Sequence, residues 1–483
     1  MRTVLVRSRY SVDLLWLSLV LCILLIIALL LQLTPHDYWW YLRLGQDVLN
    51  TGNVPGIDTY SYTRFGTPFF YQSWLAAVLL WKVYQAGGLT LTFLLRAIII
   101  ALTYSLLWFL VRDAGAGPRL SSLLTLLAAL AGSGNWSVRP QLFTYPLFAL
   151  TLFVLVRWDR GSKKGVWLLP LISMLWVNLH GSFPLLFILA MFALLFGRGD
   201  KKHLALILGV SALMLLINPH GINVFGYVSN MLSSPSNQLY SNEWRPMVNL
   251  GWQANLFFLW LLLFIPLVTF STRKPTLFEW ALFLFFGWMA LSGIRYVIWF
   301  LFILAFVTAS LLANWDARSL ESTTDKERPL VNLMIASLVI LMPFGLLPDL
   351  RESWWRDAPR PYNGDNPIHA TEWLAARPEL EGPLWSDFSH SSYLIFALPS
   401  RPVWIDTRFE LYSPEDWQEY SSVASASPDW QELLDEEGIQ LAMLSTHAQP
   451  LLIKAMRESG GWCEQYLDED AVIFSRSGSA SCP

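Results

Sequence analysis

Two aspartates flank a short amphipathic segment near the N-terminus. Asp37 follows His36 directly after the first long apolar run, residues 12–33, and Asp58 comes after the amphipathic segment. A carboxylate at such a membrane exit can take the proton from an attacking hydroxyl group, which is general-base chemistry. Asp is also favoured just before a helix, where it caps backbone N–H groups. The sequence leaves both roles open for Asp37. It leaves His36 as a partner of Asp37, an anion ligand or a wet interfacial residue.

Asp58 has three open interpretations. It can bind a divalent cation, Mg²⁺ or Mn²⁺, together with Asp37, because these ions prefer oxygen ligands. It can instead orient an acceptor molecule. It can also belong simply to the turn Gly56-Ile57-Asp58, since Gly and Asp are common turn residues. Residues 34–69 contain no Asp-Asp, Glu-Asp or Asp-X-Asp pair, so a metal site in this loop would depend on Asp37 and Asp58.

The segment between the two aspartates has the periodicity of a helix. Polar residues recur at i, i+3, i+4 and i+7, and apolar residues recur at i+4 on another face. The polar face is Arg43, Gln46, Asp47 and Asn50, and the apolar face is Trp40, Leu44 and Val48. Gly52 followed by Pro55 is a helix stop. We therefore predict an amphipathic helix over 38–51 that lies in the membrane interface, with its Trp and Tyr rings at headgroup depth.

The composition indicates a multi-pass membrane protein. The chain of 483 residues is 54% hydrophobic and only 14% charged, and it contains 25 Trp. The hydrophobic share is above that of soluble domains and the charged share is well below it. Apolar runs such as 12–33 and 91–111 are long enough to cross a bilayer. The formal net charge of −3 gives no indication of a nucleic-acid partner.

Basic residues beside the apolar runs set the expected orientation, because cytoplasmic loops are enriched in Lys and Arg. Arg2, Arg7 and Arg9 predict a cytoplasmic N-terminus, and no small-residue cleavage site follows the first apolar run. Further basic loops lie at 157–164, 198–202 and 273–274. The positions of these loops allow residues 70–111 only one net crossing. We therefore expect 12 apolar segments with 11 full crossings, segment 70–86 being re-entrant or interfacial.

Seven polar residues fall at ends of apolar segments on the predicted outer face. They are Arg139, Asn178, His180, His220, Glu243, Arg245 and Arg295. Arg295 lies between two apolar segments, where a charge is costly and usually functional or paired; the alternative is that its side chain reaches lipid headgroups. Two copies of Asn-X-His-Gly, at 178–181 and 218–221, lack the His spacing of zinc proteases. Lining of a sugar or phosphate pocket and ordinary helix capping both remain open for them.

The composition changes near residue 350, which marks a domain boundary. We expect a membrane domain at 1–349 with the first outer loop at 34–69, and a small extracytoplasmic α/β domain at 350–483. The tail contains short apolar runs at 393–398, 403–405, 439–444 and 471–474, and a helical pattern at 430–437. Cys463 and Cys482 either form a disulfide outside the cytoplasm or stay as free thiols.

The order of these features resembles the GT-C superfamily of membrane glycosyltransferases, which includes the protein O-mannosyltransferases and the aminoarabinose transferases of lipid A. In that superfamily the first extracytoplasmic loop carries the catalytic carboxylate just after the first span, and a juxtamembrane helix follows. The matching residue here is Asp37 in His36-Asp37. The resemblance covers the general plan of roughly the first 350 residues. It implies a polytopic α-helical fold with a polyprenyl-phosphate-linked sugar as donor.

The activity implied by this resemblance is transfer of a hexosyl or pentosyl group, with inversion, to an extracytoplasmic glycan, lipid or protein. Asp37 is then the general base, and the outer-face cations stabilise the departing lipid phosphate as charge builds on its oxygens. The polyprenyl tail stays among the membrane lipids. Two other classes remain as alternatives: a membrane transporter or flippase, and a non-catalytic assembly scaffold for cell-envelope polysaccharide. A transporter is expected to carry charges at mid-span, whereas the polar residues here gather at one face.

Overall fold

The computed structural model of the protein describes the backbone of residues 2–35, 37–320 and 328–477; the side chains of residues 2–10 and 315–320 are not described. Contacts divide the chain into two compact units, each of which is built from three separate stretches. Unit 1 comprises Met1–Leu31, Ala86–Ile222 and Asn242–Pro359, and unit 2 comprises Gln32–Gln85, Asn223–Ser241 and Arg360–Pro483.

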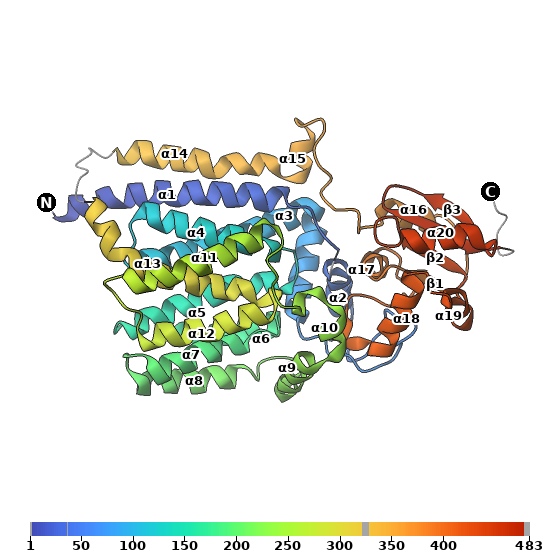
Figure 1. Cartoon of the computed structure of the whole chain (residues 1–483), viewed down its shortest axis with the longest axis horizontal. Coiled ribbons are helices and arrows are strands. Elements are labelled where there is room, and N and C mark those ends of the chain that lie inside the picture. Colours follow the sequence, from blue (N-terminus) through green and yellow to red (C-terminus); the bar gives the residue numbers. More distant parts are fainter. Residues whose placement is uncertain (1, 36, 321–327, 478–483) are drawn as a thin grey trace. The chain divides into compact units, whose positions relative to one another are not determined.

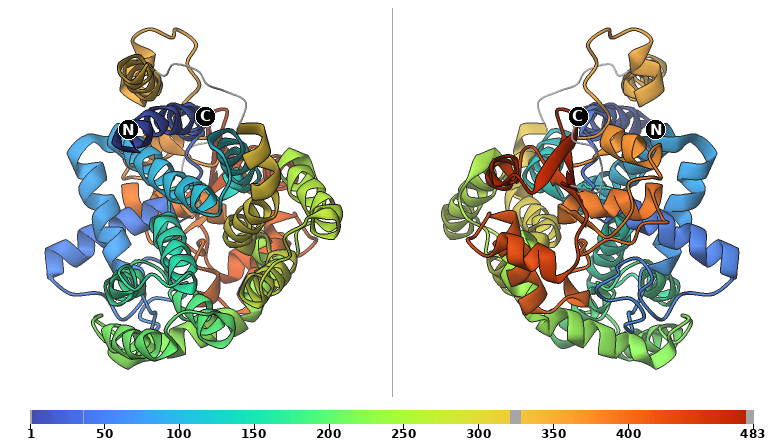
Figure 2. Two further views of the ribbon diagram at one scale, coloured as in Figure 1. Left: turned by 90° about the vertical axis from the view of Figure 1, so that its left-hand side faces the viewer. Right: turned by 90° about the vertical axis from the view of Figure 1, so that its right-hand side faces the viewer.

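Unit 1 is a bundle of roughly aligned apolar helices (Figure 1), and Figure 2 looks along their axes. Its helices are α1 (Arg2–Leu30), the second part of α3 (Trp74–Asp113), α4 (Pro118–Gly132), α5 (Thr144–Asp159), α6 (Leu169–Leu179), α7 (Pro184–Phe196), α8 (Lys201–Met214), α11 (Gly251–Phe270), α12 (Leu277–Ser292), α13 (Val297–Leu320), α14 (Pro329–Leu341) and α15 (Pro348–Glu352). Short 3-10 turns connect several of them: η1 (Ser133–Asn135), η2 (Pro140–Phe143), η3 (Val166–Leu168), η4 (Gly221–Asn223), η5 (Asn242–Trp244), η6 (Ile294–Tyr296) and η7 (Met342–Leu346).

Helix α13 is the centre of this bundle. Every residue from Val297 to Leu311 is buried, and α13 packs against α4 and α12. A helix that is apolar on all sides is stable only when its whole circumference is covered, by protein or by lipid. The sequence pattern alone does not distinguish the two, and here neighbouring helices provide the cover. The turn η6, which contains Arg295, directly precedes α13.

Helices at the periphery of unit 1 expose large apolar side chains instead. In α14, Leu330 is 71% exposed and Leu338 is 68% exposed, and in α12 Trp288 is 73% exposed. Contiguous exposed apolar surface of this kind is rare on soluble monomers, and it fits contact with acyl chains. Within the described residues, six helical stretches are long and apolar enough to cross a membrane: Ser11–Leu30, Trp74–Asp113, Pro140–Asp159, Gly251–Phe270, Ile294–Asn314 and Pro329–Leu346. Three shorter apolar stretches accompany them: Val166–Leu179, Pro184–Phe196 and Leu277–Ser292.

The predicted inner loops gather at one end of unit 1. Ion pairs connect helix ends there: Arg112–Asp13, Arg160–Asp113, Lys163–Asp200, Arg198–Asp159 and Arg273–Glu279. The predicted outer loops meet one another in the same way, through contacts such as the Arg139–Glu243 ion pair. The alternation of helix ends read from the basic loops is therefore confirmed within unit 1. Which end faces the cytoplasm, and the number of 11 crossings, stay predictions.

Most of residues 70–111, for which the basic loops allow only one net crossing, lie in helix α3. This helix is broken at Gly87 and Gly88, and Gly88 has φ 55°, a left-handed conformation that glycine adopts without a steric penalty. The boundary between the two units falls just before this break. The Arg112–Asp13 pair places the end of α3 beside the start of α1, so residues 86–113 run antiparallel to α1.

Unit 2 is a mixed α/β structure. Its helices are α2 (Tyr38–Thr51), the first part of α3, α9 (Val224–Ser233), α10 (Pro235–Tyr240), α16 (Ile368–Ala375), α17 (Phe388–Ala397), α18 (Pro414–Ala424), α19 (Trp430–Glu436) and α20 (Pro450–Ser459), with the 3-10 turn η8 (Phe409–Leu411). Its strands are β1 (Leu384–Ser386), β2 (Leu441–Ser445), β3 (Trp462–Leu467) and β4 (Ala471–Arg476). The sheet order is β1-β2-β4-β3; β1 and β2 are parallel, with Leu384 opposite Leu441, and the other pairs are antiparallel. The expected α/β character of the tail is confirmed, although the apolar run 393–398 lies mostly in helix α17 rather than in a strand.

The two faces of strand β2 are buried in different clusters. Ala442 and Leu444 pack with Trp417 on one face, while Leu441 and Met443 pack with Trp40 on the other. Alternate side chains of a strand point to opposite faces, so a helix from the first loop and helices from the tail cover the same sheet. Helix α2 is thus one layer of the α/β unit.

Two expectations about the first loop need restating. The predicted helix 38–51 is confirmed as α2, but the rings of Tyr38, Trp39 and Trp40 are buried by protein rather than exposed to lipid. Their depth in the membrane stays a prediction. Loop 34–69, assigned to the membrane domain from its position, contacts the C-terminal region, for example through the Ser61–Val403 bridge and the Asp58–Arg408 ion pair. The physical reason is that the apolar face of α2 is used to cover the sheet. The domain boundary itself stays a prediction.

One of the two tail cysteines has a determined state. Cys463 in β3 is disulfide-bonded, and Cys482, its expected partner, lies outside the described residues. Cys22 in helix α1 is a free cysteine.

Helix α2 approaches the first part of α3 very closely at Gly45. A Cβ atom at position 45 would overlap the carbonyl oxygen of Ala77 and crowd Trp81. Gly45→Ala should therefore lower the free energy of unfolding by about 1–3 kcal/mol, the usual cost of overpacking a core. The measurement is thermal unfolding of the purified protein in detergent.

The matched control for this prediction is Gly209→Ala in helix α8, where a Cβ atom would meet nothing within 4 Å. That change should leave stability unchanged or raise it slightly, because Ala is the better helix former. Equal stability of the two variants would show that α2 and α3 are not in such close contact.

Candidate functional site

Asp37 occupies the position before helix α2, but its side chain does not cap the helix. Its Oδ1 accepts a hydrogen bond from the indole Nε1 of Trp40 at 3.2 Å. The same N–H group is 3.2 Å from Oγ1 of Thr407, so Trp40 ties Asp37 to the C-terminal region of unit 2. Asp37 is partly exposed. Asp37 does not act as a helix cap in these contacts, which favours its interpretation as a proton acceptor. His36 lies outside the described residues.

A second carboxylate lies in the neighbourhood of Asp37. Tyr41 stacks on Trp40 with ring centroids 3.7 Å apart. Burial raises the pKa of Tyr41 well above its usual range, and the nearby carboxylates of Asp37 and Glu410 raise it further. Glu410 also lies three residues after Thr407, whose Oγ1 is 3.2 Å from the Trp40 indole nitrogen that donates to Asp37. Glu410 belongs to the turn η8 and is exposed, and the sequence analysis did not identify it.

The segment that carries Glu410 is held by a fully buried arginine. Nη2 and Nε of Arg408 donate to the two oxygens of Asp406 at 2.6 and 2.9 Å. Its Nη1 donates to Oδ1 of Asp58 at 2.6 Å and to the hydroxyl of Tyr71 at 3.0 Å. The Tyr412 hydroxyl donates to Asp406 at 2.7 Å. All three charged side chains are completely buried. Because an unpaired charge there would be very costly, the network fixes the position of each member.

Arg408 also reaches the side chain that holds Asp37. Its guanidinium carbon lies 5.8 Å from the ring centroid of Trp40 and 5.2 Å from that of Tyr60. Rings and a guanidinium group at such distances attract each other. One signal in the sequence could have indicated this segment: Asp406-Thr407-Arg408 is a charged stretch directly after an apolar run, where buried pairs occur.

Asp58 is engaged on both carboxylate oxygens. Oδ1 accepts from Arg408 and from the backbone N–H of Tyr60 at 3.1 Å. Oδ2 accepts from the hydroxyl of Ser61 at 2.6 Å and from its backbone N–H at 3.1 Å. Of its three interpretations, this geometry favours the turn, here reinforced by the buried arginine.

The described residues do not offer the pair Asp37 and Asp58 as a metal site. The oxygens of Asp58 are directed at Arg408 and Ser61, as described above. Within residues 2–35, 37–320 and 328–477, no group of three or more His, Cys, Asp or Glu side chains is arranged to hold a metal ion. A site built on these two aspartates therefore does not fit, and the chemistry below is derived from the protein's side chains.

Breaking the buried network at Arg408 should be strongly destabilising. Arg408→Leu leaves Asp58 and Asp406 buried without their counter-charge, which typically costs about 3–5 kcal/mol. The expected result is a marked fall in the thermal unfolding temperature of the purified protein. A control is Arg457→Gln, which removes the exposed pair with Glu464 and should cost about 0–1 kcal/mol. Similar small effects for both variants would contradict the role given to Arg408.

Unit 1 brings together four of the predicted outer-face residues. Arg139 forms an ion pair with Glu243. The guanidinium carbon of Arg295 lies 4.5 Å from the ring centroid of Trp244, the residue after Glu243. His180 is close enough to Arg139, Glu243 and Arg295 for their charges to act on it. We call Arg139, His180, Glu243 and Arg295 the outer polar cluster.

His180 is a neutral hydrogen-bond donor within this cluster. Burial, and then the guanidinium groups of Arg295 and Arg139, lower the pKa of His180 to about 3. Its Nδ1 accepts the backbone N–H of Ser182 at 3.1 Å, so the ring proton resides on Nε2. The cluster thus combines two cations, one carboxylate and one neutral N–H donor. A net positive charge with several donors suits a phosphate group.

The other predicted outer-face residues make contacts that connect helix ends and turns. The Asn178 side chain donates to the backbone oxygens of Met174 and Ile217, both at 2.8 Å, and so joins the ends of two helices. The backbone oxygen of Arg245 accepts from Ile294 at 3.0 Å, which connects η5 to η6. In the second Asn-X-His-Gly copy, the His220 backbone N–H donates to Asn218 at 2.8 Å. None of these contacts gives His220 or Asn178 a direct place in the outer polar cluster.

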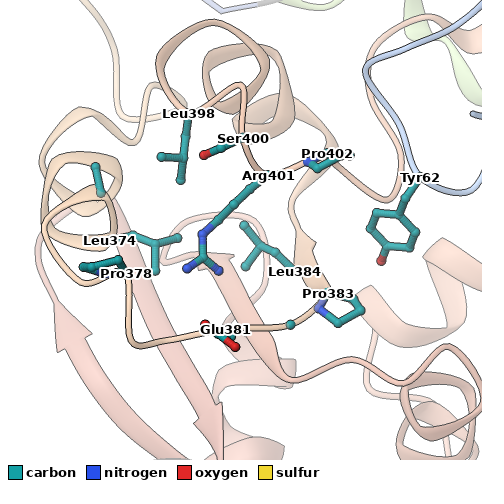
Figure 3. Close-up of a pocket in the computed structure, with 12 residues that line it drawn as sticks. Tyr62, Leu374, Pro378, Glu381, Pro383, Leu384, Leu398, Ser400, Arg401 and Pro402 are labelled. Carbon is teal, nitrogen blue, oxygen red and sulfur yellow. The ribbon is translucent and has the colours of Figure 1, made fainter.

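Unit 2 also contains a cavity of about 540 Å³ at the start of β1 (Figure 3). Arg401, Glu381 and Tyr62 supply its polar groups, and prolines and leucines form much of its wall. Its lining includes none of the residues predicted to act in chemistry.

Comparison with known proteins gives similarity in structure only. The sequence matches no family model and shows no significant similarity to a curated protein. Among solved structures, the fold is similar to the oligosaccharyltransferase AglB from Archaeoglobus fulgidus, in complex with an inhibitory peptide and a dolichol-phosphate. The TM-score is 0.58 at 13% identity, and the match covers 96% of this chain and 74% of AglB.

Two further solved structures share the fold. ArnT from Cupriavidus metallidurans, bound to undecaprenyl phosphate, matches with a TM-score of 0.52 at 12% identity over 99% of this chain and 98% of ArnT. The arabinofuranosyltransferase AftD from Mycobacteria matches with a TM-score of 0.59 at 14% identity over 95% of this chain but only 41% of AftD. The chain therefore shares the fold of these three proteins, in agreement with the fold that its sequence resemblance implied, and its long apolar helices make it an integral membrane protein.

Proposed function

We propose that this protein transfers a sugar from a polyprenyl-phosphate-linked donor to an extracytoplasmic acceptor, with inversion and with Asp37 as general base. The observation that carries the proposal is the state of Asp37. It stands at the start of the helix that follows the first apolar span, it is partly exposed, and it holds a hydrogen bond from Trp40 rather than capping the helix. A carboxylate fixed in this way can accept a proton in a defined direction.

The reaction proposed for this arrangement is a single displacement. An oxygen of the acceptor hydroxyl attacks the anomeric carbon of the donor sugar, and the carboxylate of Asp37 takes the hydroxyl proton. The bond between the anomeric carbon and the phosphate oxygen breaks, and polyprenyl phosphate leaves with the bonding electron pair. Attack opposite to the leaving group inverts the anomeric centre. The hydrogen bond from the Trp40 N–H to Oδ1 orients the carboxylate of Asp37.

The outer polar cluster is the part of unit 1 suited to the donor phosphate. Arg295 rests on the face of Trp244, which orients a guanidinium group without neutralising it. Arg139 is paired with Glu243, and His180 is neutral. The side chains together retain one positive charge in excess, which is appropriate for a phosphodiester. Negative charge that builds on the departing phosphate is stabilised most by cations already fixed in place.

The ligands of two solved structures with this fold support a polyprenyl-phosphate-linked donor. AglB was solved with a dolichol-phosphate and ArnT with undecaprenyl phosphate, and both are polyprenyl phosphates. The rival interpretations gain less from the structure. A transporter would be expected to place charges near mid-span, whereas the four members of the outer polar cluster lie together at helix ends. A cytoplasmic N-terminus and an extracytoplasmic C-terminal region are part of the proposal.

Asp37→Asn should abolish most of the activity while it preserves the fold. The carboxamide oxygen can still accept the Trp40 N–H, but the amide is not a proton acceptor in the reaction. A positioned general base contributes about 10²- to 10⁴-fold to the rate, so kcat should fall by that factor. The measurement is sugar transfer from a polyprenyl-phosphate donor by the purified protein.

Thermal unfolding of Asp37→Asn should match that of the wild type. The exposed Asp357→Asn, at a position in unit 1 outside the outer polar cluster, serves as the control and should keep full activity. Equal rates for wild type and Asp37→Asn at equal stability would reject the catalytic assignment.

Arg295 should contribute to affinity for the lipid phosphate. Loss of hydrogen bonds to a charged group costs about 1.5–3 kcal/mol, which corresponds to about 10- to 150-fold in affinity. Arg295→Ala should weaken binding of undecaprenyl phosphate by that factor. Arg295→Lys should weaken it less, because it keeps the charge but loses the planar fork. Binding is measured by titration of the protein in nanodiscs.

The control for this measurement is Arg198→Ala, at the opposite end of unit 1, which should bind the lipid as the wild type does. If Arg295→Ala bound undecaprenyl phosphate normally, contact with lipid headgroups would be the remaining explanation for Arg295.

A further inference from the structure

A second cavity in unit 2 is lined mainly by polar side chains. It has a volume of about 430 Å³, and its walls come from the end of α9, the start of α10 and the chain around η8. The polar groups that line it include Arg64, Asn230, Ser233, Ser234, Glu410 and Ser413. These residues provide an amide, hydroxyls, a guanidinium group and a carboxylate. Walls of this kind favour a ligand that is itself rich in hydroxyl groups.

Helix α9 contacts the first loop as well as this cavity. Asn230, which lines the cavity, lies three residues after Tyr227, so the two are neighbours on the helix surface. Tyr227 stacks on Phe70 with centroids 5.0 Å apart and an angle of 15° between the rings. The helix that lines the cavity is therefore held against the first loop by this ring stack.

Glu410 connects the cavity to the surroundings of Asp37. It lines the cavity, and it lies three residues after Thr407, whose hydroxyl is 3.2 Å from the Trp40 indole nitrogen that donates to Asp37. Its turn, η8, begins directly after the buried Arg408 and contacts α10. The Ser236 hydroxyl donates to the backbone oxygen of Tyr412 at 2.7 Å, which closes the wall below η8. The position of Glu410 is thus fixed by buried contacts on both sides.

We propose that this cavity is the acceptor subsite, that it takes a saccharide, and that Glu410 positions the acceptor by accepting a hydrogen bond from one of its hydroxyl groups. The proposal rests on the proposed function, because it assigns the acceptor of that reaction. Glu410 keeps its own charge throughout, and Asp37 alone takes the proton of the attacking hydroxyl. A saccharide is favoured over a lipid acceptor because an acyl or prenyl chain would need apolar walls, which this cavity offers only in part.

Partition of the donor between an added acceptor and water tests the proposal. The purified protein in nanodiscs is given undecaprenyl-phosphate mannose as donor and methyl mannobioside as acceptor, and transfer and hydrolysis are measured together. Glu410→Gln should lower the ratio of transfer to hydrolysis at least tenfold and raise the KM for the glycoside. Ser233→Trp, which fills the cavity from an exposed position on α9, should do the same without disturbing η8. Glu436→Gln, an exposed carboxylate in helix α19 outside the cavity, should keep the wild-type ratio.

The outcomes separate this proposal from the one on which it rests. Absence of both transfer and hydrolysis in the wild type would mean that the proposed function itself is wrong. Hydrolysis without transfer to the glycoside, or a preference for a long-chain alcohol over the glycoside, would overturn the saccharide assignment. A wild-type ratio in both Glu410→Gln and Ser233→Trp would overturn the placement of the acceptor in this cavity. If transfer and hydrolysis fell equally in Glu410→Gln, with an unchanged KM for the glycoside, Glu410 would serve Asp37 and not the acceptor.

Discussion

The buried position of Arg408 between Asp58 and Asp406 is the constraint on which unit 2 depends. A guanidinium group without solvent is tolerated only when carboxylates and hydroxyls surround it, and here Asp58 comes from the first loop while Asp406 comes from the C-terminal region. The ion pairs therefore join two stretches that are about 350 residues apart in sequence. Such a connection closes a long loop of chain. The loop-closure entropy it costs grows only slowly with length, and the burial of the first loop against the sheet offsets it.

The consequences of this connection reach the proposed base. Arg408 lies near Trp40, the Trp40 indole binds both Asp37 and Thr407, and Glu410 follows two residues after Arg408. The α/β part of the chain is consequently more than an appended domain. It supplies the surroundings that define which way the carboxylate of Asp37 points. The same network thus satisfies buried charges, which stabilises unit 2, and restricts Trp40, which orients the proposed base Asp37.

In unit 1, charged residues at helix ends specify which helices are neighbours. Its helices are apolar on nearly all sides, so hydrophobicity alone gives little information about which neighbours each helix packs against. Charged residues provide that information. Ion pairs join helix ends at one end of the bundle, and the outer polar cluster gathers at other helix ends, next to the start of the buried central helix α13. Charges cannot be accommodated along the apolar length of the helices without a large cost, and their segregation to the ends creates a polar surface where chemistry on a lipid phosphate can occur.

The sequence by itself determined the membrane class, the helix at 38–51, the alternation of helix ends and the α/β character of the tail, because each of these follows from local composition or periodicity. It also determined that Asp37 stands directly after the first span. Only the tertiary structure decided what surrounds these residues. The sequence predicted that α2 lies in the membrane interface, whereas its apolar face packs against the sheet of the C-terminal region. The position of Glu410 near Asp37, and the engagement of Asp58 with Arg408, depend on contacts between residues hundreds of positions apart. Periodicity and spacing describe neighbours along the chain, and they carry no signal for pairs of this kind.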